Sequence, residues 1–365
     1  MTLKTLKTLA TPHGDLELPT FLPDATRGVV RCLDSNDLEA IGIDACVVNT
    51  LHLRHEPGIS VVERAGGMHR FMRWDRPLAS DSGGFQAFSL ARSGGGSVHV
   101  TNKELAYRRF KGDERHTLSP EQCIKLQFDL GADLMFCLDE CTHPDQAEDA
   151  QRASVDHTIE WAKRCRAEFL TRAQRLEPSR RPKLFAVVQG GTSVELRKRC
   201  AGELVAIGFE GYAYGGWPVD DEGRLLDAVG LTAESLPRDA PKHALGIGKL
   251  ESIVRTHALG YDLFDCVLPT RDARMGRLYV LDPDLDATIR TASKPSSYVY
   301  VKDDKHFDSD APVDASCDCS TCARYSRGYL RHLFAIGETT AGRLATIHNL
   351  RAYVRLMHAL RAATS

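Results

Sequence analysis

Two aspartates stand where a strand end would present an acid to a substrate. Asp265 follows a short apolar run and precedes a prolyl turn, while Asp81 ends residues 78–81 and precedes Gly83 and Gly84. Cleavage of a glycosidic bond with retained configuration needs one carboxylate to attack the sugar carbon and a second to handle the leaving group's proton. Two acids on two strand ends could flank one such substrate. The alternative for each acid is a structural one, in which its carboxylate caps the following turn.

Three cysteines and a histidine make a candidate metal site near the end of the chain. Cys317, Cys319 and Cys322 form a tight knuckle, and His348 follows later in a helix-like segment. Zinc prefers four such sulfur and nitrogen ligands in a tetrahedron. Because four protein ligands leave no open position, we expect one structural Zn²⁺ per subunit. The alternative is three buried thiols that lie close together only in sequence.

Short apolar runs alternate with helix-like segments along most of the chain. The runs cover residues 45–49, 78–81, 134–139, 184–189, 212–215, 243–246 and 263–267. Helix starts lie between them, as at Ser119 and Pro120, where serine suits the cap and proline the first helical position. Strands that alternate with helices predict a parallel sheet.

The polar residues fall at the carboxyl ends of these runs, which favours a closed sheet. They are Asp81, Asp139, Gln189, Gly215, Gly216, Lys249 and Asp265. A closed barrel brings all such ends to one face. An open doubly wound sheet gathers ligands only at its switch point and usually carries a glycine-rich phosphate turn, for which there is no fingerprint. We therefore predict an α/β fold, a (β/α)8 TIM barrel.

The predicted barrel takes residues 1–276 and part of the C-terminal helices, and a zinc-binding subdomain with basic C-terminal helices takes residues 277–365. Residues 277–314 predict short strands and loops that lead to the metal site. Residues 93–97 are rich in glycine and precede a short hairpin close behind Asp81, which makes them a candidate lid.

Composition restricts the class of protein. Of the 365 residues, 42% are hydrophobic and 26% charged, which is typical of a globular enzyme. No apolar stretch reaches the roughly 20 residues that span a bilayer, so we expect no membrane partner. Eleven cysteines at no disulfide-like spacing favour reduced thiols and a cytoplasmic location.

Charge is unevenly distributed along the chain. The net charge of −2 is not that of a strongly basic nucleic-acid binder. Seven arginines nevertheless lie between Ala323 and the end, against the single acid Glu338. This clustering beside the metal site favours contact with phosphates, and a solvated helix face is the alternative.

Taken together, these features resemble the tRNA-guanine transglycosylases, the queuine and archaeosine tRNA-ribosyltransferase family, and its bacterial members in particular. The resemblance runs from about Thr11 to Arg351. It is carried, in the family's order, by residues 81–86, 138–141, 188–191, 212–216, 246–249 and 264–271 and by the Cys-Cys-Cys-His set. It implies a pentosyltransferase of the tRNA-guanosine(34) transglycosylase type, which exchanges the wobble guanine for a 7-deazaguanine base in queuosine biosynthesis.

The resemblance also implies a role for individual residues. Asp265 would be the nucleophile that holds the RNA covalently, and Asp81 the general acid and base. Base recognition would fall to Asp139, Gln189, Gly215, Gly216, Cys141, Val219 and the stacking ring of Phe85. Nucleotides flanking the guanine would contact Lys249, Arg271 and Arg274, for which salt bridges to Asp272 or Asp262 are the alternative. The implied partners are tRNA, guanine and a second copy of the chain.

The substrate stays open at this stage. Cys141 and Val219 align with small residues that accompany 7-aminomethyl-7-deazaguanine, whereas Trp217, Pro218 and Asp221 depart from the bacterial pattern. The alternatives are queuine or another 7-deazaguanine, the same chemistry on DNA, or a non-catalytic RNA-binding partner subunit. A partner of that kind is expected to lack one or both catalytic aspartates, and both are present.

Overall fold

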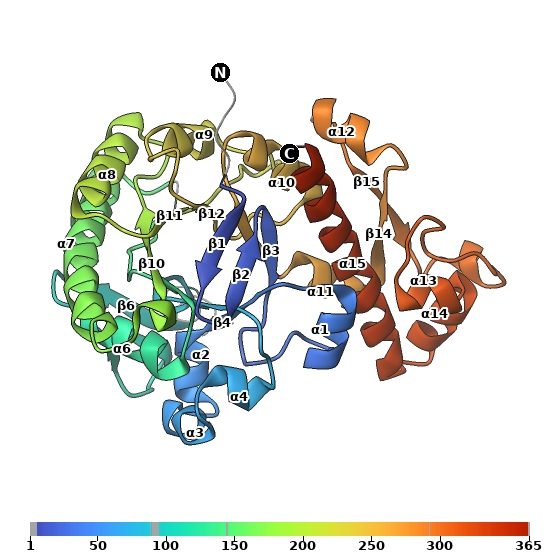
Figure 1. Ribbon diagram of the computed structural model, residues 1–365, viewed down its shortest axis with the longest axis horizontal. Helices are drawn as coiled ribbons and strands as arrows, with labels where there is room; N and C mark the ends of the chain where they lie inside the picture. Colours follow the sequence, from blue (N-terminus) through green and yellow to red (C-terminus); the bar gives the residue numbers. More distant parts are fainter. Residues whose placement is uncertain (1–5, 88, 90–94, 144, 292, 364–365) are drawn as a thin grey trace.

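A ring of parallel strands forms the centre of the protein. The computed structural model describes residues 6–87, 89, 95–143, 145–291 and 293–363 (Figure 1). The strands are β3 (Thr20–Pro23), β4 (Cys46–Asn49), β5 (Leu78–Asp81), β9 (Leu134–Phe136), β10 (Lys183–Val188), β11 (Gly211–Tyr214), β12 (Lys242–Ala244) and β13 (Leu263–Cys266). Their spatial order is β3-β13-β12-β11-β10-β9-β5-β4, so chain neighbours are also sheet neighbours.

The two ends of this sheet meet. Asp24, just after β3, forms a parallel bridge with Val47 of β4, and the Ala25 amide donates to the Val47 carbonyl oxygen at 2.7 Å. The predicted (β/α)8 barrel is thereby confirmed. Its first strand, Thr20–Pro23, was not predicted, because four residues that end in proline form too short a run to stand out. Residues 137–139, predicted as strand, leave the sheet after Phe136.

Alternate residues of the strands fill the barrel interior. An apolar cluster takes Leu22, Val47, Ala79, Leu134, Phe136, Phe185, Val187, Ala213 and Leu263 from seven of the eight strands. Side chains two positions apart in a strand share a face. Asn49, Asp81, Gln189 and Asp265 each lie two positions after one of these residues, so the same inward face ends in polar groups at the barrel mouth.

Helices surround the barrel (Figure 1). They are α1 (Ser35–Ile41), α2 (Thr50–His55), α3 (Ile59–Ala65), α4 (Met68–Met72), α6 (Pro120–Leu130), α7 (Glu148–Ala173), α8 (Val194–Ile207), α9 (Asp227–Glu234), α10 (Leu250–Ala258) and α11 (Leu268–Met275), with a 3-10 turn η1 (Pro178–Arg180). Ser119 caps α6 as predicted, since its hydroxyl accepts from the Gln122 amide while the Gln122 side chain accepts from the Ser119 amide. None of the described helices is both long and apolar enough to cross a membrane.

Two small sheets are added to the barrel ends. The hairpin of β1 (Thr8–Thr11) and β2 (Gly14–Glu17) inserts Leu9 and Leu16 into the interior cluster. After β5, an antiparallel sheet contains β6 (Gly95–Val100), β7 (Leu105–Phe110) and β8 (His116–Leu118). This confirms a hairpin behind Asp81. Residues 93 and 94 of the predicted lid lie outside the described residues.

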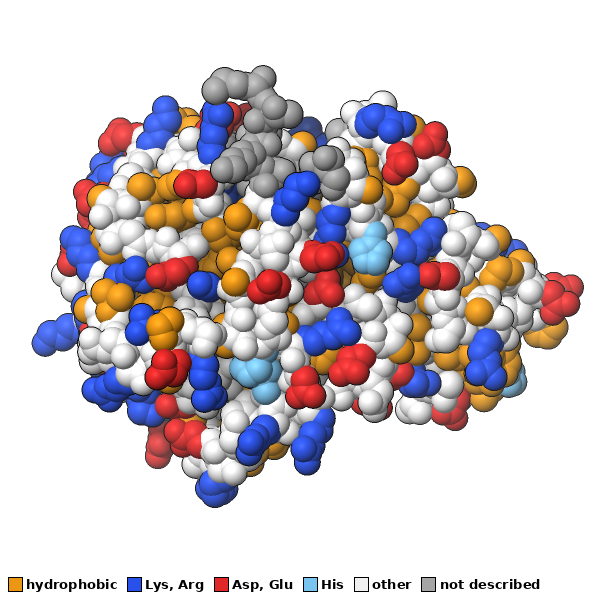
Figure 2. Space-filling model, in the orientation of Figure 1, with side chains coloured by type: hydrophobic (Ala, Val, Ile, Leu, Met, Phe, Trp, Pro, Cys, Tyr) orange, Lys and Arg blue, Asp and Glu red, His pale blue; other side chains and the backbone are white. Residues whose placement is uncertain are grey.

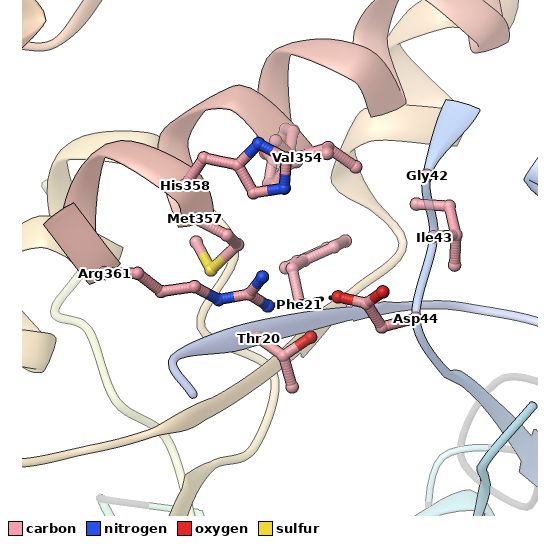
Figure 3. Close-up of a pocket in the computed structure, with 10 residues that line it drawn as sticks. Thr20, Phe21, Gly42, Ile43, Asp44, Val354, Met357, His358 and Arg361 are labelled. Carbon is pink, nitrogen blue, oxygen red and sulfur yellow. Dashed lines mark hydrogen bonds and ion pairs between the residues drawn. The ribbon is translucent and has the colours of Figure 1, made fainter. Parts of the chain in front are cut away.

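The chain after the barrel returns to it. The strands β14 (Arg277–Leu281) and β15 (Ser296–Tyr300) form an antiparallel pair, and α12 (Leu285–Thr291) lies between them in the chain. After β15 come η2 (Asp304–His306), α13 (Ser320–Arg324), α14 (Arg327–Ala335) and α15 (Thr339–Ala363). The helix α15 packs on β3, α1, α10 and α11, between the barrel and the outer lobe (Figure 1). Near its end, Arg361 forms an ion pair with Asp44 at 3.0 Å and borders a small pocket beside Phe21 (Figure 3). The helix α15 therefore packs against both the barrel and the outer lobe.

Candidate active site and metal centre

Asp81 closes β5 and has one free oxygen. Its Oδ2 accepts from Asn49 Nδ2 at 3.3 Å and from Gln86 Nε2 at 3.1 Å, whereas no hydrogen bond to Oδ1 occurs in the described part of the chain. Burial raises the pKa of Asp81 to about 8, and the negative charge of Asp265 adds to the rise. Asp81 therefore carries a proton at neutral pH, as a general acid must.

Asp265 lies on β13 and is held differently. His243 Nε2 donates to its Oδ1 at 2.9 Å, and the Gly246 amide donates to the same oxygen at 3.1 Å. Among the described residues, none donates to Oδ2. Two donors thus fix one carboxylate oxygen, and the described residues leave the other oxygen without a donor. The two acids therefore differ: burial keeps a proton on Asp81, whereas hydrogen bonds hold one oxygen of Asp265. A proton donor and a nucleophile in one site need environments that differ in this way.

Two polar side chains, Asp139 and Gln189, pair with each other near Asp81. Asp139 is buried and accepts from Gln189 Nε2 at 2.7 Å. Burial raises the pKa of Asp139 to about 6, against the hydrogen bond from Gln189, so the carboxylate is still largely ionised at neutral pH. The backbone of Gly215 passes so close that a Cβ there would lie 2.4 Å from Gln189 Nε2. Only glycine allows the loop after β11 to pass this close to Gln189.

Aromatic rings gather in the segments that follow three strands. Phe85, on a helical turn after β5, is 43% exposed. Its ring lies edge-to-face with Trp217, with 6.2 Å between centroids, and the Trp217 ring also lies 5.2 Å from the His143 ring. Tyr214 Oη donates to the Trp217 carbonyl oxygen at 3.0 Å, which fixes the tryptophan backbone. The segments after β5, β9 and β11 therefore share one aromatic wall.

The other predicted pocket residues lie on the same loops. Cys141 follows Asp139 and is half-buried, and burial raises the pKa of its thiol, so it stays protonated. Val219 forms an antiparallel bridge with Leu225 in the loop after β11. Gly216 adopts φ +99°, and a Cβ there would lie 3.2 Å from Arg197 Nη2. The structure brings these residues to the barrel mouth.

A buried arginine that sequence reasoning missed supports two of these loops. Arg197, on α8, is fully buried and donates to the carbonyl oxygens of Val188, Gly191 and Gly215 at 2.8–2.9 Å. Its guanidinium also lies 4.3 Å from the centre of the Tyr214 ring. One cation thus joins the ends of β10 and β11. Its position in the middle of a helical pattern carries no signal for this.

Three basic residues predicted to contact RNA, Lys249, Arg271 and Arg274, lie on the segments after β12 and β13. Lys249 Nζ donates weakly to the Gly223 carbonyl at 3.4 Å. Arg274 Nη1 is buried and has no hydrogen-bond partner among the described residues, and burial together with nearby arginines lowers the pKa of Arg274. Asp272 instead accepts from Tyr279 Oη, which lies 2.6 Å away. Within the described residues, neither Asp272 nor Asp262 forms an ion pair with Arg271 or Arg274, so the salt-bridge alternative is wrong.

Most of the C-terminal arginines, which were predicted to contact phosphates, already have partners within the protein. Four of them pair with one acid each, as Arg331–Asp304, Arg343–Asp37, Arg351–Asp318 and Arg355–Asp314. Arg361 pairs with Asp44 and Glu17, and Arg327 donates to two backbone carbonyls. On the face seen in Figure 2, basic and acidic side chains accordingly alternate. These arginines attach α14 and α15 to the rest of the protein.

The predicted metal ligands come together in the outer lobe. One ligand atom each of Cys317, Cys319, Cys322 and His348 lies within 4.8 Å of every other. His348 Nδ1 is 3.2 Å from Cys322 Sγ and 3.7 Å from Cys319 Sγ. Tetrahedral zinc with bonds of about 2.3 Å to sulfur and about 2.0 Å to nitrogen places such atoms about 3.5 Å apart. The four side chains therefore fit a structural metal ion.

A backbone carbonyl fixes the orientation of the His348 ring. His348 Nε2 lies 2.6 Å from the Tyr279 carbonyl oxygen, which can only accept, so Nε2 carries the proton. The lone pair then sits on Nδ1, which faces the sulfur atoms. A backbone carbonyl that fixes the tautomer is the usual partner of a metal-binding histidine.

A second His-rich group lies at the opposite end of the barrel. Asp133 precedes β9 and accepts from His13 Nδ1 at 2.8 Å and from the Leu78 amide at 2.8 Å, while His69 Nε2 is 3.1 Å away. The two imidazoles stack with 3.5 Å between centroids. Parallel rings cannot direct both lone pairs at one ion, so this group links the β1–β2 hairpin to the barrel.

Comparison with known proteins identifies the family of the chain. A model of the family described as queuine tRNA-ribosyltransferase matches residues 4–365. The queuine tRNA-ribosyltransferase of Thermoanaerobacter pseudethanolicus is 40% identical over 97% of this chain and 88% of its own length. Those of Desulfosudis oleivorans, at 40% identity over 98% and 88%, and Mannheimia succiniciproducens, at 39% over 96% and 87%, are similar. The chain belongs to the queuine tRNA-ribosyltransferase family and is an enzyme of the tRNA-guanine transglycosylase class.

Proposed function

We propose that the protein exchanges the wobble guanine of tRNA for a 7-deazaguanine base by double displacement. The observation that carries this proposal is the difference between the two acids at the barrel mouth. Asp265 has one oxygen held by two donors and one left free, whereas burial keeps Asp81 protonated. A retaining glycosyl transfer needs a nucleophile and a proton donor of this kind.

In the first half of the reaction, Asp265 Oδ2 attacks C1′ of the guanosine ribose. The C1′–N9 bond breaks, its electron pair leaves with the guanine, and the proton of Asp81 neutralises the departing base. The product is an ester between C1′ and Asp265, with Asp81 now ionised. His243 and Gly246 hold the other oxygen of Asp265 throughout.

In the second half, the incoming base binds in the place of guanine. Asp81 takes the proton from its N9, and N9 attacks C1′ from the side that guanine left. The ester bond breaks with its electrons returning to Asp265, so both acids recover their starting charge. Two inversions at C1′ give net retention.

Asp139 and Gln189 suit the edge of a guanine-like base. The N1–H and exocyclic amine of guanine are adjacent donors, and an ionised Asp139 is a matching acceptor. Gln189 donates to Asp139 from one side, and the Gly216 backbone lies within reach on the other. The exposed face of Phe85 offers a stacking surface for a base flipped out of its strand. Loss of the ring by Phe85→Ala should therefore weaken binding of the base.

The RNA itself would lie across the basic residues beside the nucleophile. Among the described residues, Arg274 Nη1 is buried and has no acceptor, and Arg271 is exposed. A guanidinium with a free N–H is suited to a phosphate or a base edge. Lys249 forms a weak bond to Gly223, from which its side chain would move toward the RNA.

The remaining expectations follow the family. We assign zinc to the Cys317, Cys319, Cys322 and His348 site, because the sulfur–nitrogen distances match its bond lengths. Exposed apolar side chains on the outer lobe, such as Phe307 and Ile336, support a homodimer that covers them. Action on tRNA supports a cytoplasmic location.

For the incoming base we favour 7-aminomethyl-7-deazaguanine over queuine. Phe85, Trp217 and His143 form an aromatic wall near the candidate base site, and Cys141 is half-buried. A small substituent would need less space beside these side chains than a cyclopentenediol. Queuine remains the second candidate, because Trp217, Pro218 and Asp221 differ from the bacterial pattern.

The test is incorporation of labelled guanine into tRNA with an unmodified wobble guanine. Addition of 7-aminomethyl-7-deazaguanine should suppress incorporation, while queuine at the same concentration should not. Suppression by queuine alone would reverse the substrate assignment. No incorporation into tRNA, with transfer into a guanine-containing DNA instead, would move the reaction to DNA, and no transfer at all would favour the partner-subunit alternative.

A further inference from the structure

His243 is a polar residue within the apolar layer of the barrel interior. In the parallel register its neighbours are Ala213 and Leu263, which both belong to the interior apolar cluster. The His243 side chain is fully buried. A buried polar ring in an apolar layer costs free energy unless its hydrogen bonds compensate. The position therefore needs a reason.

The reason lies in the atoms that the ring reaches. Nε2 donates to Asp265 Oδ1 at 2.9 Å, two residues beyond the Leu263 partner on the neighbouring strand. On the other side, the ring packs edge-to-face on Phe136, with 5.2 Å between centroids. His243 therefore connects the core of the barrel to the carboxylate at its mouth.

The ring has one defined protonation state in this setting. An ionised carboxylate can only accept, so the proton lies on Nε2. Nδ1 is buried without a partner in the described part of the chain. A second proton there would create a buried cation with an unsatisfied N–H. His243 is thus a neutral donor and does not compete with Asp81 for the proton of the reaction.

We propose that His243 is a positioning residue for the nucleophile, which rests on the proposed function of Asp265. Together with the Gly246 amide, it fixes Oδ1 and so turns Oδ2 toward the sugar carbon. Neither donor contacts the substrate. Without the imidazole, the carboxylate would be held by a single backbone donor and could rotate about its Cβ–Cγ bond.

The effect should appear in the rate of ester formation and not in binding. Misplacement of a reacting group by about 1 Å costs about 100-fold in rate. We therefore expect His243→Leu to lower the single-turnover rate of RNA attachment about 100-fold, with KM for tRNA and guanine within about threefold. His243→Gln, whose amide nitrogen can occupy the place of Nε2, should recover at least about tenfold of this loss.

Two matched variants separate positioning from packing. His243→Asn keeps an amide but is too short to reach Oδ1, so it should be as slow as His243→Leu. Phe136→Leu disturbs the ring contact and leaves the donor in place, so it should react within about threefold of the unchanged protein. Melting temperatures of all four variants show which of them fold. The glutamine and asparagine pair decides the question if the leucine variant does not fold.

The inference is overturned if His243→Leu or His243→Asn attaches RNA at the normal rate, or if glutamine and asparagine are equally slow. A readout that does not depend on the reaction is the ¹⁵N spectrum of the labelled imidazole. It should show a neutral ring protonated at Nε2, and Asp265→Ala should alter the Nε2 proton signal. A ring protonated at Nδ1 overturns the inference whatever the substrate is. Failure of the unchanged protein to incorporate guanine would instead refute the proposed function.

Discussion

Replacement of Asp81 by asparagine should remove the proton donor. It should also make the variant more stable relative to the original protein at pH 7 than at pH 5. Asparagine has the same shape, and its carbonyl oxygen can accept the bonds from Asn49 and Gln86. An unfolded aspartate loses its proton near a pKa of 3.8, whereas burial and then the Asp265 charge raise the folded pKa to about 8. Between these values the folded chain binds one proton more than the unfolded chain, so stability falls as pH increases.

The slope gives the size of the effect. One proton corresponds to about 1.4 kcal/mol per pH unit. From pH 5 to pH 7 the original protein should therefore lose about 2.7 kcal/mol relative to Asp81→Asn. With an unfolding entropy of about 2.1 cal/mol/K per residue, this is a change of about 3 °C in the difference between the two melting temperatures. Taking the difference at each pH cancels titrations that both proteins share.

The assay is thermal unfolding of both proteins, together with Asp15→Asn as a control substitution at an exposed aspartate. Guanine exchange by Asp81→Asn should fall sharply while tRNA binding stays near normal. A stability difference that is flat from pH 5 to pH 7 would show that Asp81 is ionised in the folded protein. The general-acid assignment would then fail on its physical basis.

Removal of zinc by a chelator, or Cys319→Ser, should lower the melting temperature and dissociate dimers, because structural zinc sites contribute about 10 to 16 kcal/mol of folding free energy in small domains; purified protein without metal would refute the site. Arg271→Ala should weaken tRNA binding and reduce its salt dependence, whereas Arg351→Ala should affect stability only; equal losses of tRNA affinity would restore the phosphate role of the C-terminal arginines. The ion pair with Asp133 raises the pKa of His13, so its contribution is present below about pH 6.5 and is lost as pH rises through the folded pKa. His13→Asn should therefore destabilise by less than about 1 kcal/mol, more at pH 5.5 than at pH 8, and a larger loss at pH 8 would contradict this pairing.

Much of the site could be read from the sequence because strand ends carry it. Asp81, Asp265 and Gln189 each follow an apolar run, and the period of two within a strand places them on the inner face. The metal ligands could also be predicted from the sequence, because the three cysteines lie close together in it. Residues of these two kinds have local signals that do not depend on how the sheet closes.

Other features depend on contacts between distant segments. His243 acts on Asp265 only because β12 and β13 are neighbours, and Arg197 acts on backbone carbonyls that have no sequence signature. The ion pairs of the C-terminal arginines depend on distant contacts in the same way. Their aspartate partners come from distant parts of the chain, as Asp37 does for Arg343. A count of basic residues in one segment of the chain cannot reveal such ion pairs.

The most direct test of the account is the attachment of RNA to Asp265. The protein is mixed with tRNA that carries an unmodified wobble guanine, denatured, and analysed for a covalent complex whose linked peptide is mapped by mass spectrometry. We predict an ester on Asp265 that is absent from Asp265→Asn and that disappears when guanine is added in excess. A complex that forms at the normal rate in Asp265→Asn, or that maps to another residue, would contradict the assignment of the nucleophile.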